Sequence, residues 1–187
     1  MGKPEYLLRQ ISNLLSVGIF QIQGEDVYSF HEHAESNPLY RNSELRIKLQ
    51  GNADNQSIPC ILQDPYKVYF ACIKKEDSFY MAGPMACHIL NRAELRKFYK
   101  LYGIEEEHEK RLKHFSYANM LDIVKMIANI LLDEEYTDYE LSYANHIIED
   151  TRQIEERDNI LFDMKKSEEE LYHHTYQEER KLLDRVR

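Results

Sequence analysis

Apolar side chains near the start of the chain recur at the spacing of an amphipathic helix. These residues are Leu7, Leu8, Ile11, Leu14 and Leu15. Positions three and four apart share one face of a helix. Pro4 suits a first helical turn and Gly18 follows the run, as expected around a helix. We therefore predict a helix over residues 4–16.

The middle of the chain changes to short segments with strand character. We predict strands within residues 19–30, around a turn at Gly24, and three more in an antiparallel meander. The three segments are residues 60–63, 67–74 and 78–82. Residues 67–74 carry apolar groups on both alternating faces, which is typical of a central strand covered on both sides or of a pocket wall. Gly83-Pro84 is expected to kink or end the third strand.

The intervening segments predict less regular structure. Residues 31–42 are polar and indicate a loop, and residues 43–49 predict a short helix. From residue 91 onward the pattern is helical. We expect helices over residues 91–103, 106–114, 116–132 and 139–166, and a further one that begins at the capping box of Ser167 and Glu170.

The last predicted helices carry a weak dimerisation pattern. Ile147, Ile154 and Leu161 are seven residues apart, which predicts an imperfect coiled-coil seam. Leu171 and Leu182 are the apolar positions that extend it after the capping box. The final helix carries apolar residues up to the C-terminus without a terminator, so we expect it to continue in a longer protein.

These patterns predict an α+β fold in two parts. Residues 1–132 would form a domain with an antiparallel sheet flanked by helices, and residues 133–187 an acidic helical linker or stalk for dimerisation. The net charge of −9 lies entirely in the second part, which has 17 acidic and 8 basic residues, whereas the first part balances. DNA affinity comes mainly from cations that neutralise phosphates, so this chain is not expected to bind DNA or an anionic membrane by itself.

The chain has the features of a cytoplasmic protein. Cys60, Cys72 and Cys87 are odd in number and lack metal-ligand spacing, which favours reduced thiols over a disulfide framework. The N-terminus lacks the apolar core of a signal peptide. The longest apolar run, residues 127–132, is far too short to span a bilayer.

The sequence offers little evidence for catalytic or metal-binding residues. His31 and His33 could share a metal on a strand, but a third ligand is not evident. Cys87 and His88 would point to opposite faces of a strand. Motifs for nucleophilic catalysis, zinc hydrolysis and phosphate binding are absent from the sequence. We expect neither an enzyme nor a metal or cofactor site.

Aromatic and sulfur-containing side chains on neighbouring predicted strands suggest a ligand cavity. Phe70, Cys72, Phe79 and Met81 would line it, and the chain is rich in tyrosine, with 14 residues. Such a lining suits a small apolar ligand. The same residues equally suit a packed sheet face, so the alternative of a plain core stays open.

Three segments carry a resemblance to a known family. They are residues 68–90, the stretch Phe98-Tyr99-Lys100-Leu101-Tyr102-Gly103, and residues 173–187 with their pattern of paired histidines, paired leucines and a terminal Val-Arg. In these segments the chain resembles the N-terminal region of Gram-positive AraC-type transcription regulators, in particular those found beside YSIRK-signal surface antigens.

The resemblance implies a function and its partners. A PAS- or GAF-like sensory domain would bind a small-molecule effector, and a helical stalk would hold a homodimer. DNA would be bound only through helix-turn-helix motifs that lie beyond Arg187. The alternatives are an interaction module that dimerises without a ligand and, less favoured, an enzyme of small metabolites.

The predicted seam generates a test of dimerisation. Charged substitutions at Ile154 and Leu161 should shift the protein from dimer towards monomer, because each would place a charge in an apolar helix contact. Light scattering measures the mass directly. An unchanged dimer mass in the double variant would contradict the predicted seam.

Overall fold

A computed structural model of the chain describes residues 2–32, 34–105 and 110–146. The chain divides into two compact units, Met1–Ile147 and Ile148–Arg187. The five expected dimerisation positions, Ile147, Ile154, Leu161, Leu171 and Leu182, lie outside the described residues. The described elements are α1 (Lys3–Leu15), β1 (Gly18–Gln23), β2 (Asp26–Ser29), η1 (Ala34–Ser36), α2 (Pro38–Arg41), α3 (Ser43–Asp54), β3 (Cys60–Gln63), β4 (Val68–Lys75), β5 (Ser78–Ala86), α4 (Arg92–Leu101), α5 (Tyr117–Leu132) and α6 (Asp138–Ala144).

The fold is α+β with one five-stranded antiparallel sheet of order β2-β1-β5-β4-β3. Strands β1 and β2 form a hairpin, and β3, β4 and β5 form the predicted meander. Strand β4 lies between β5 and β3 and is buried on both faces over residues 68–73. The prediction of a central strand covered on both sides is therefore confirmed.

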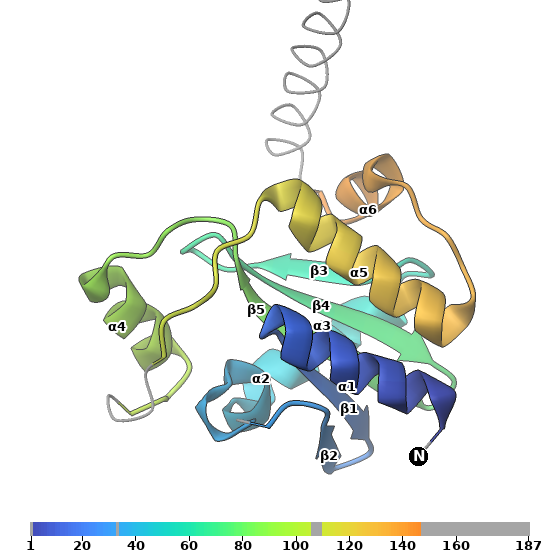
Figure 1. Ribbon diagram of the computed structural model, residues 1–187, viewed down its shortest axis with the longest axis horizontal. Coiled ribbons are helices and arrows are strands. Elements are labelled where there is room, and N and C mark those ends of the chain that lie inside the picture. The colour runs from blue at the N-terminus through green and yellow to red at the C-terminus, as the bar shows by residue number, and fades with distance from the viewer. Residues whose placement is uncertain (1, 33, 106–109, 147–187) are drawn as a thin grey trace, which may run out of the picture. The chain divides into compact units, whose positions relative to one another are not determined.

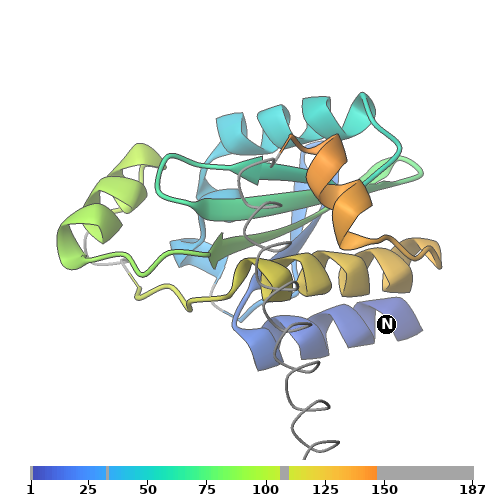
Figure 2. The same ribbon diagram turned by 90° about the horizontal axis from the view of Figure 1, so that it is seen from above.

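Helices cover both faces of the sheet (Figures 1 and 2). Helix α3 lies on one face, where Leu45 and Leu49 belong to a core cluster with Phe70 and Cys72 of β4. Helices α1 and α5 lie on the other face, where the ring of Tyr69 contacts that of Tyr117, 5.8 Å between centroids. The alternation of side chains along β4 thus supplies two separate layers of core. None of the described helices has the length and apolar character that crossing a bilayer requires.

The segment between the hairpin and the meander is more ordered than its polar sequence suggests. Residues 31–42 were expected to form a loop, but they contain η1 and α2. Asn37 explains this difference, because its side-chain oxygen accepts a hydrogen bond from Leu39 N at 2.9 Å and caps α2. Asn42 caps α3 in the same way through Leu45 N, and α3 continues to Asp54, beyond the expected end at residue 49.

The compact unit extends past residue 132, where the sequence analysis placed the domain boundary. Helix α6 belongs to this unit and contacts α5 and β3. Lys125 on α5 forms ion pairs with Asp122 at 2.7 Å and with Asp138 at 2.6 Å, which ties the start of α6 to α5. The helix predicted over residues 139–166 begins in this region, but α6 ends at Ala144, and residues from 147 onward lie outside the described part.

Strand β5 does not end at Gly83-Pro84 but runs through both residues to Ala86. Gly83 has φ of +142°, in a region that side chains with a Cβ rarely adopt. A Cβ there would lie 2.8 Å from Cδ1 of Phe70 and 3.0 Å from the Tyr69 carbonyl oxygen. The register of β4 against β5 shifts between Tyr69 and Ala71, next to this point. Glycine is therefore what lets the two central strands stay paired.

Two glycine substitutions are expected to have opposite effects on stability. Gly83→Ala should lower the free energy of unfolding by about 2–4 kcal/mol, because it adds backbone strain and a clash in the core. Gly51→Ala, in α3, should raise it by about 0.5–1 kcal/mol, because no atom lies near the added Cβ and alanine favours helix. Denaturant unfolding measures both values. A Gly83→Ala variant as stable as the wild type would contradict the close packing at this position.

Candidate functional site: the strap pocket

The sheet residues expected to line a ligand cavity lie in a packed core. Phe70, Cys72 and Met81 are each 0% exposed, and Phe79 is half-buried. The register places Met81 directly opposite Cys72, and both belong with Phe70 to the core cluster. Phe79 lies at the edge of this cluster, with the ammonium of Lys74 5.8 Å from its ring centroid. The structure thus brings the four residues together, as packing partners.

Side chains from two helices fill the space over these strands. Leu45 and Leu49 come from α3, and Phe98 comes from α4. Tyr102, just after α4, packs its ring against Phe70 with 5.5 Å between centroids. Burial raises the pKa of the Cys60 thiol to about 11 and raises that of Cys72 as well. Both thiols are therefore protonated at neutral pH and weakly nucleophilic, which fits a structural role.

The other titratable candidates also have ordinary surroundings. Nδ1 of His31 lies 3.2 Å from Oγ of Ser12, and His33 lies outside the described residues. Cys87 is half-buried and His88 is exposed. Across residues 2–32, 34–105 and 110–146, no group of three or more His, Cys, Asp or Glu side chains is arranged to hold a metal ion.

The largest difference from the predicted structure lies just before α5. Residues 106–114 were predicted as a helix, but residues 110–113 have no regular secondary structure, and residues 106–109 lie outside the described part. We call residues 110–115 the strap. His114 forms a parallel bridge with Ala86 at the end of β5, and Phe115 N donates to the Ala86 oxygen at 2.9 Å. Pairing with β5 explains why the end of this segment is not helical.

A second hydrogen bond holds the other end of the strap. The hydroxyl of Tyr99, on α4, donates to the carbonyl oxygen of Lys110 at 2.7 Å. Tyr99 is 1% exposed, so its ring is fixed within the core. The backbone of residues 111–113 is therefore suspended between an anchor on α4 and an anchor on β5.

A buried carboxylate lies against the C-terminal end of α4. Asp64 follows β3 and accepts hydrogen bonds from the backbone N–H groups of Tyr66 at 2.8 Å and Val68 at 2.9 Å. Its second oxygen accepts a longer bond from the Tyr102 hydroxyl, at 3.4 Å. Burial raises the pKa of Asp64, although these hydrogen bonds oppose the change, and burial raises the pKa of Tyr102. The turn after β3 thus contacts the C-terminal end of α4 through one long hydrogen bond.

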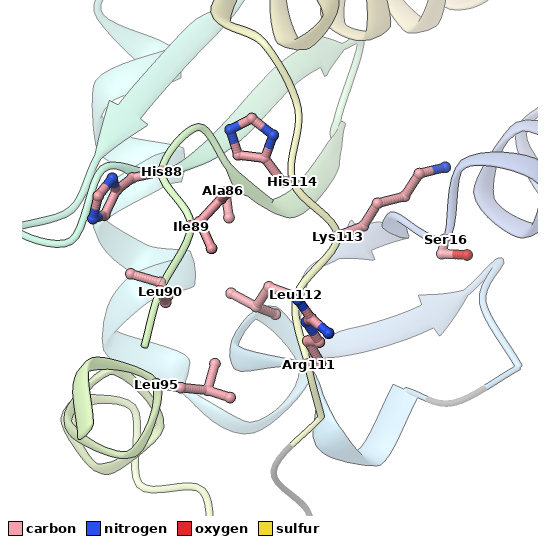
Figure 3. Close-up of a pocket in the computed structure, with 10 residues that line it drawn as sticks. All are labelled: Ser16, Ala86, His88, Ile89, Leu90, Leu95, Arg111, Leu112, Lys113 and His114. Atoms are coloured by element: carbon pink, nitrogen blue, oxygen red, sulfur yellow. The ribbon is translucent and has the colours of Figure 1, made fainter. Parts of the chain in front are cut away.

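A cavity of about 460 Å³ opens between the strap, the end of β5 and the start of α4 (Figure 3). We call it the strap pocket. Its lining residues are Ser16, Ala86, His88, Ile89, Leu90, Leu95, Arg111, Leu112, Lys113 and His114. The leucines approach one another between α4 and the strap, Arg111 lies beside Leu112, and the side chain of Lys113 extends towards Ser16 (Figure 3). The volume is within the range of pockets that bind small molecules.

Sequence reasoning missed this site. The run Lys110-Arg111-Leu112-Lys113-His114 follows an acidic stretch and lies within the helix predicted over residues 106–114. A basic cluster in a chain of net charge −9 was the available signal. Pairing with Ala86, which turns this cluster towards the end of β5, depends on tertiary structure. Chemically, the lining offers cations and apolar surface, which suits binding rather than catalysis.

Comparison of the chain with protein-family models, with curated proteins and with solved structures gave no significant match.

The Tyr99 anchor generates a prediction about the strap. Tyr99→Phe should lower the free energy of unfolding by about 1 kcal/mol, because one hydrogen bond of a buried tyrosine is lost. It should also speed amide hydrogen exchange within residues 110–115, since that segment loses one of its two anchors. Hydrogen-exchange mass spectrometry of the peptide that covers the strap measures the effect.

Tyr102→Phe is the matched control. It removes a hydroxyl from the same end of α4 but breaks only the long bond to Asp64. Exchange in the strap should match that of the wild type. Equal exchange rates in both variants would mean that the Tyr99 hydroxyl does not anchor the strap.

Proposed function

We propose that the chain is the sensing and dimerising region of an AraC-type transcription regulator, with a PAS/GAF-like sensor in its first unit and a non-catalytic role. The strap pocket would hold a small effector. Dimerisation would use the predicted helical seam, and DNA would be bound by helix-turn-helix motifs elsewhere in the full-length regulator. The observation that carries the sensing role is the strap pocket, a cavity of about 460 Å³ lined by the segment that leads into α5.

The strand arrangement supports the PAS/GAF-like part of the proposal. A first hairpin, an insertion of helices and a three-stranded meander give the order β2-β1-β5-β4-β3. The proposed PAS- or GAF-like sensor would have an antiparallel sheet flanked by helices, as this unit has (Figure 1). Because one fold serves many functions, the argument for sensing rests on the pocket rather than on topology.

The route from the pocket to the end of the unit supports a signalling role. The strap ends at Phe115, and the next residue, Ser116, caps α5 by accepting a hydrogen bond from Asn119 N at 3.1 Å. Helix α5 is tied to α6 by the Lys125 ion pairs. A ligand that binds one strap position better than another would therefore bias α5 and α6, as a population shift requires.

Asn145, the residue that follows α6, bonds to the edge strand of the sheet through its side chain. The Asn145 side-chain oxygen accepts a hydrogen bond from Ile61 N at 2.7 Å, and its nitrogen donates to the Pro59 oxygen at 3.0 Å. Asn145 thus bonds to the free edge of β3 in the way a neighbouring strand would. The residues that would lead into the dimerisation segment are held to the sensor at this point.

The second candidate is an interaction module that dimerises without a small-molecule ligand. The burial of Phe70, Cys72 and Met81 favours it, because these residues of the sheet belong to a core cluster with side chains of the covering helices. The two candidates differ in whether the strap pocket affects the output of the protein.

A reporter fusion distinguishes them. Residues 1–187 would be joined to a DNA-binding domain that represses transcription only as a dimer. We expect repression above that of the DNA-binding domain alone. Leu112→Trp, which would fill the strap pocket, should change repression about fivefold or more, the lower end of typical allosteric coupling. Ile47→Trp, at an exposed position of α3, is the control and should leave repression unchanged.

Each outcome has a clear meaning. Repression no stronger than that of the DNA-binding domain alone would contradict the dimerising role. Normal repression that does not respond to Leu112→Trp would contradict sensing through the strap pocket and favour the interaction module. Circular dichroism of both tryptophan variants checks that the fold persists.

A further inference from the structure

Among the described residues, the charged lining of the strap pocket has only one sign. His88, Arg111, Lys113 and His114 contribute to it, and no Asp or Glu within residues 2–32, 34–105 and 110–146 does. A smaller cavity of about 110 Å³ shares Arg111 and Lys113 with the strap pocket, and its described lining residues likewise include no carboxylate. A one-sign lining concentrates ligands of the opposite charge. The chain as a whole is acidic, so this region differs from its average surface.

The two strongest cations of the lining are not neutralised within the described part of the chain. Neither Arg111 nor Lys113 takes part in an ion pair there. The ammonium of Lys113 lies 5.5 Å from the ring centroid of Phe115, which leaves its charge available. Both side chains belong to exposed residues, so they are accessible to a ligand from solvent.

The remaining lining is apolar, and part of it faces solvent. Ile89 is 66% exposed, and Leu90, Leu95 and Leu112 are half-buried. Figure 3 shows Leu90, Leu95 and Leu112 grouped between α4 and the strap, with Arg111 beside Leu112. Apolar surface left open to water is stabilised when a ligand covers it.

We propose that the strap pocket binds a small amphipathic carboxylate. Its head group would pair with Arg111 and Lys113, and its apolar body would cover Ile89, Leu90 and Leu112. The planar guanidinium of arginine fits a carboxylate through two parallel hydrogen bonds. A purely polar anion would leave the apolar side chains of the pocket exposed to water. A neutral hydrocarbon would leave Arg111 and Lys113 without a partner of opposite charge. This inference rests on the proposed function and names the chemical class of its effector.

Three probes with matched parts test the two halves of the site. Octanoate has both the charge and the apolar chain, octan-1-ol has only the chain, and acetate has only the charge. Isothermal titration of the full chain at low ionic strength should show octanoate binding at least about tenfold tighter than either partial probe. Added salt should weaken octanoate binding severalfold, because screening acts on exposed charges. Equal affinity for octanoate and octan-1-ol would overturn the proposal.

Variants locate the binding. Arg111→Gln combined with Lys113→Gln should weaken octanoate binding about tenfold, which corresponds to the loss of about 1.4 kcal/mol. Ile89→Ser should weaken it severalfold through the apolar chain. Lys48→Gln, an exposed lysine of α3 that does not line the pocket, is the control and should bind like the wild type. Wild-type affinity in the Arg111 and Lys113 double variant would overturn the assignment.

A further experiment distinguishes binding of a free carboxylate from binding to a lipid surface. The protein should not float together with phosphatidylglycerol vesicles in a flotation experiment. Flotation together with absent octanoate binding would overturn the proposal. A failure of octanoate binding while Leu112→Trp still changes the reporter would remove only the ligand class and leave the sensing function in place.

Discussion

The buried side chain of Asn37 joins the parts of the fold on which the site depends. Its nitrogen donates to the Gly83 oxygen at 2.8 Å, and its oxygen caps α2 through Leu39. It lies against Gly18, where a Cβ would collide with the Asn37 amide and lie 2.9 Å from the Gly83 oxygen. A buried amide is stable only when its partners are present. One side chain therefore fixes β1, β5 and α2 together, and β5 carries the residues that receive the strap.

Much of the fold follows from local pattern, because the pattern and the tertiary structure agree. The two apolar faces of β4 are buried, and so are most of the periodic apolar residues of α5 and Leu8 and Ile11 of α1, whereas Leu14 is 79% exposed. The Asn91 cap of α4 is present, with bonds from Ala93 N and Glu94 N. The disagreements lie where a long-range partner decides the structure. Asn37 orders a polar segment, and Ala86 pairs with His114 at the end of the strap, where a helix was predicted.

At the candidate site, too, the local sequence pattern does not decide the structure where a long-range partner is needed. Phe70, Cys72 and Met81 have the composition of a ligand cavity, and sequence alone does not tell a cavity from a core. The answer depends on whether Leu45, Leu49 and other helical side chains reach the sheet, which they do. The strap pocket forms instead at the end of β5, where helical side chains do not cover the strand completely. Its lining comes from segments before and after α4, so no local motif marks it.

The position of the strap pocket explains how a surface site could influence the far end of the unit. Residues 111–113 lie between the Tyr99 and Ala86 hydrogen bonds, with Arg111 and Lys113 exposed and Leu112 packed against the core, and such a segment is easier to displace than a strand inside the sheet. Phe115 couples any displacement to α5, and Lys125 couples α5 to α6. Asn145 makes two hydrogen bonds to the edge of β3, so α6 moves with the sheet or breaks them. A displacement of α6 from the edge of β3 would therefore also have to break the contact between the Tyr117 and Ser142 hydroxyls and expose Leu141, which is 0% exposed.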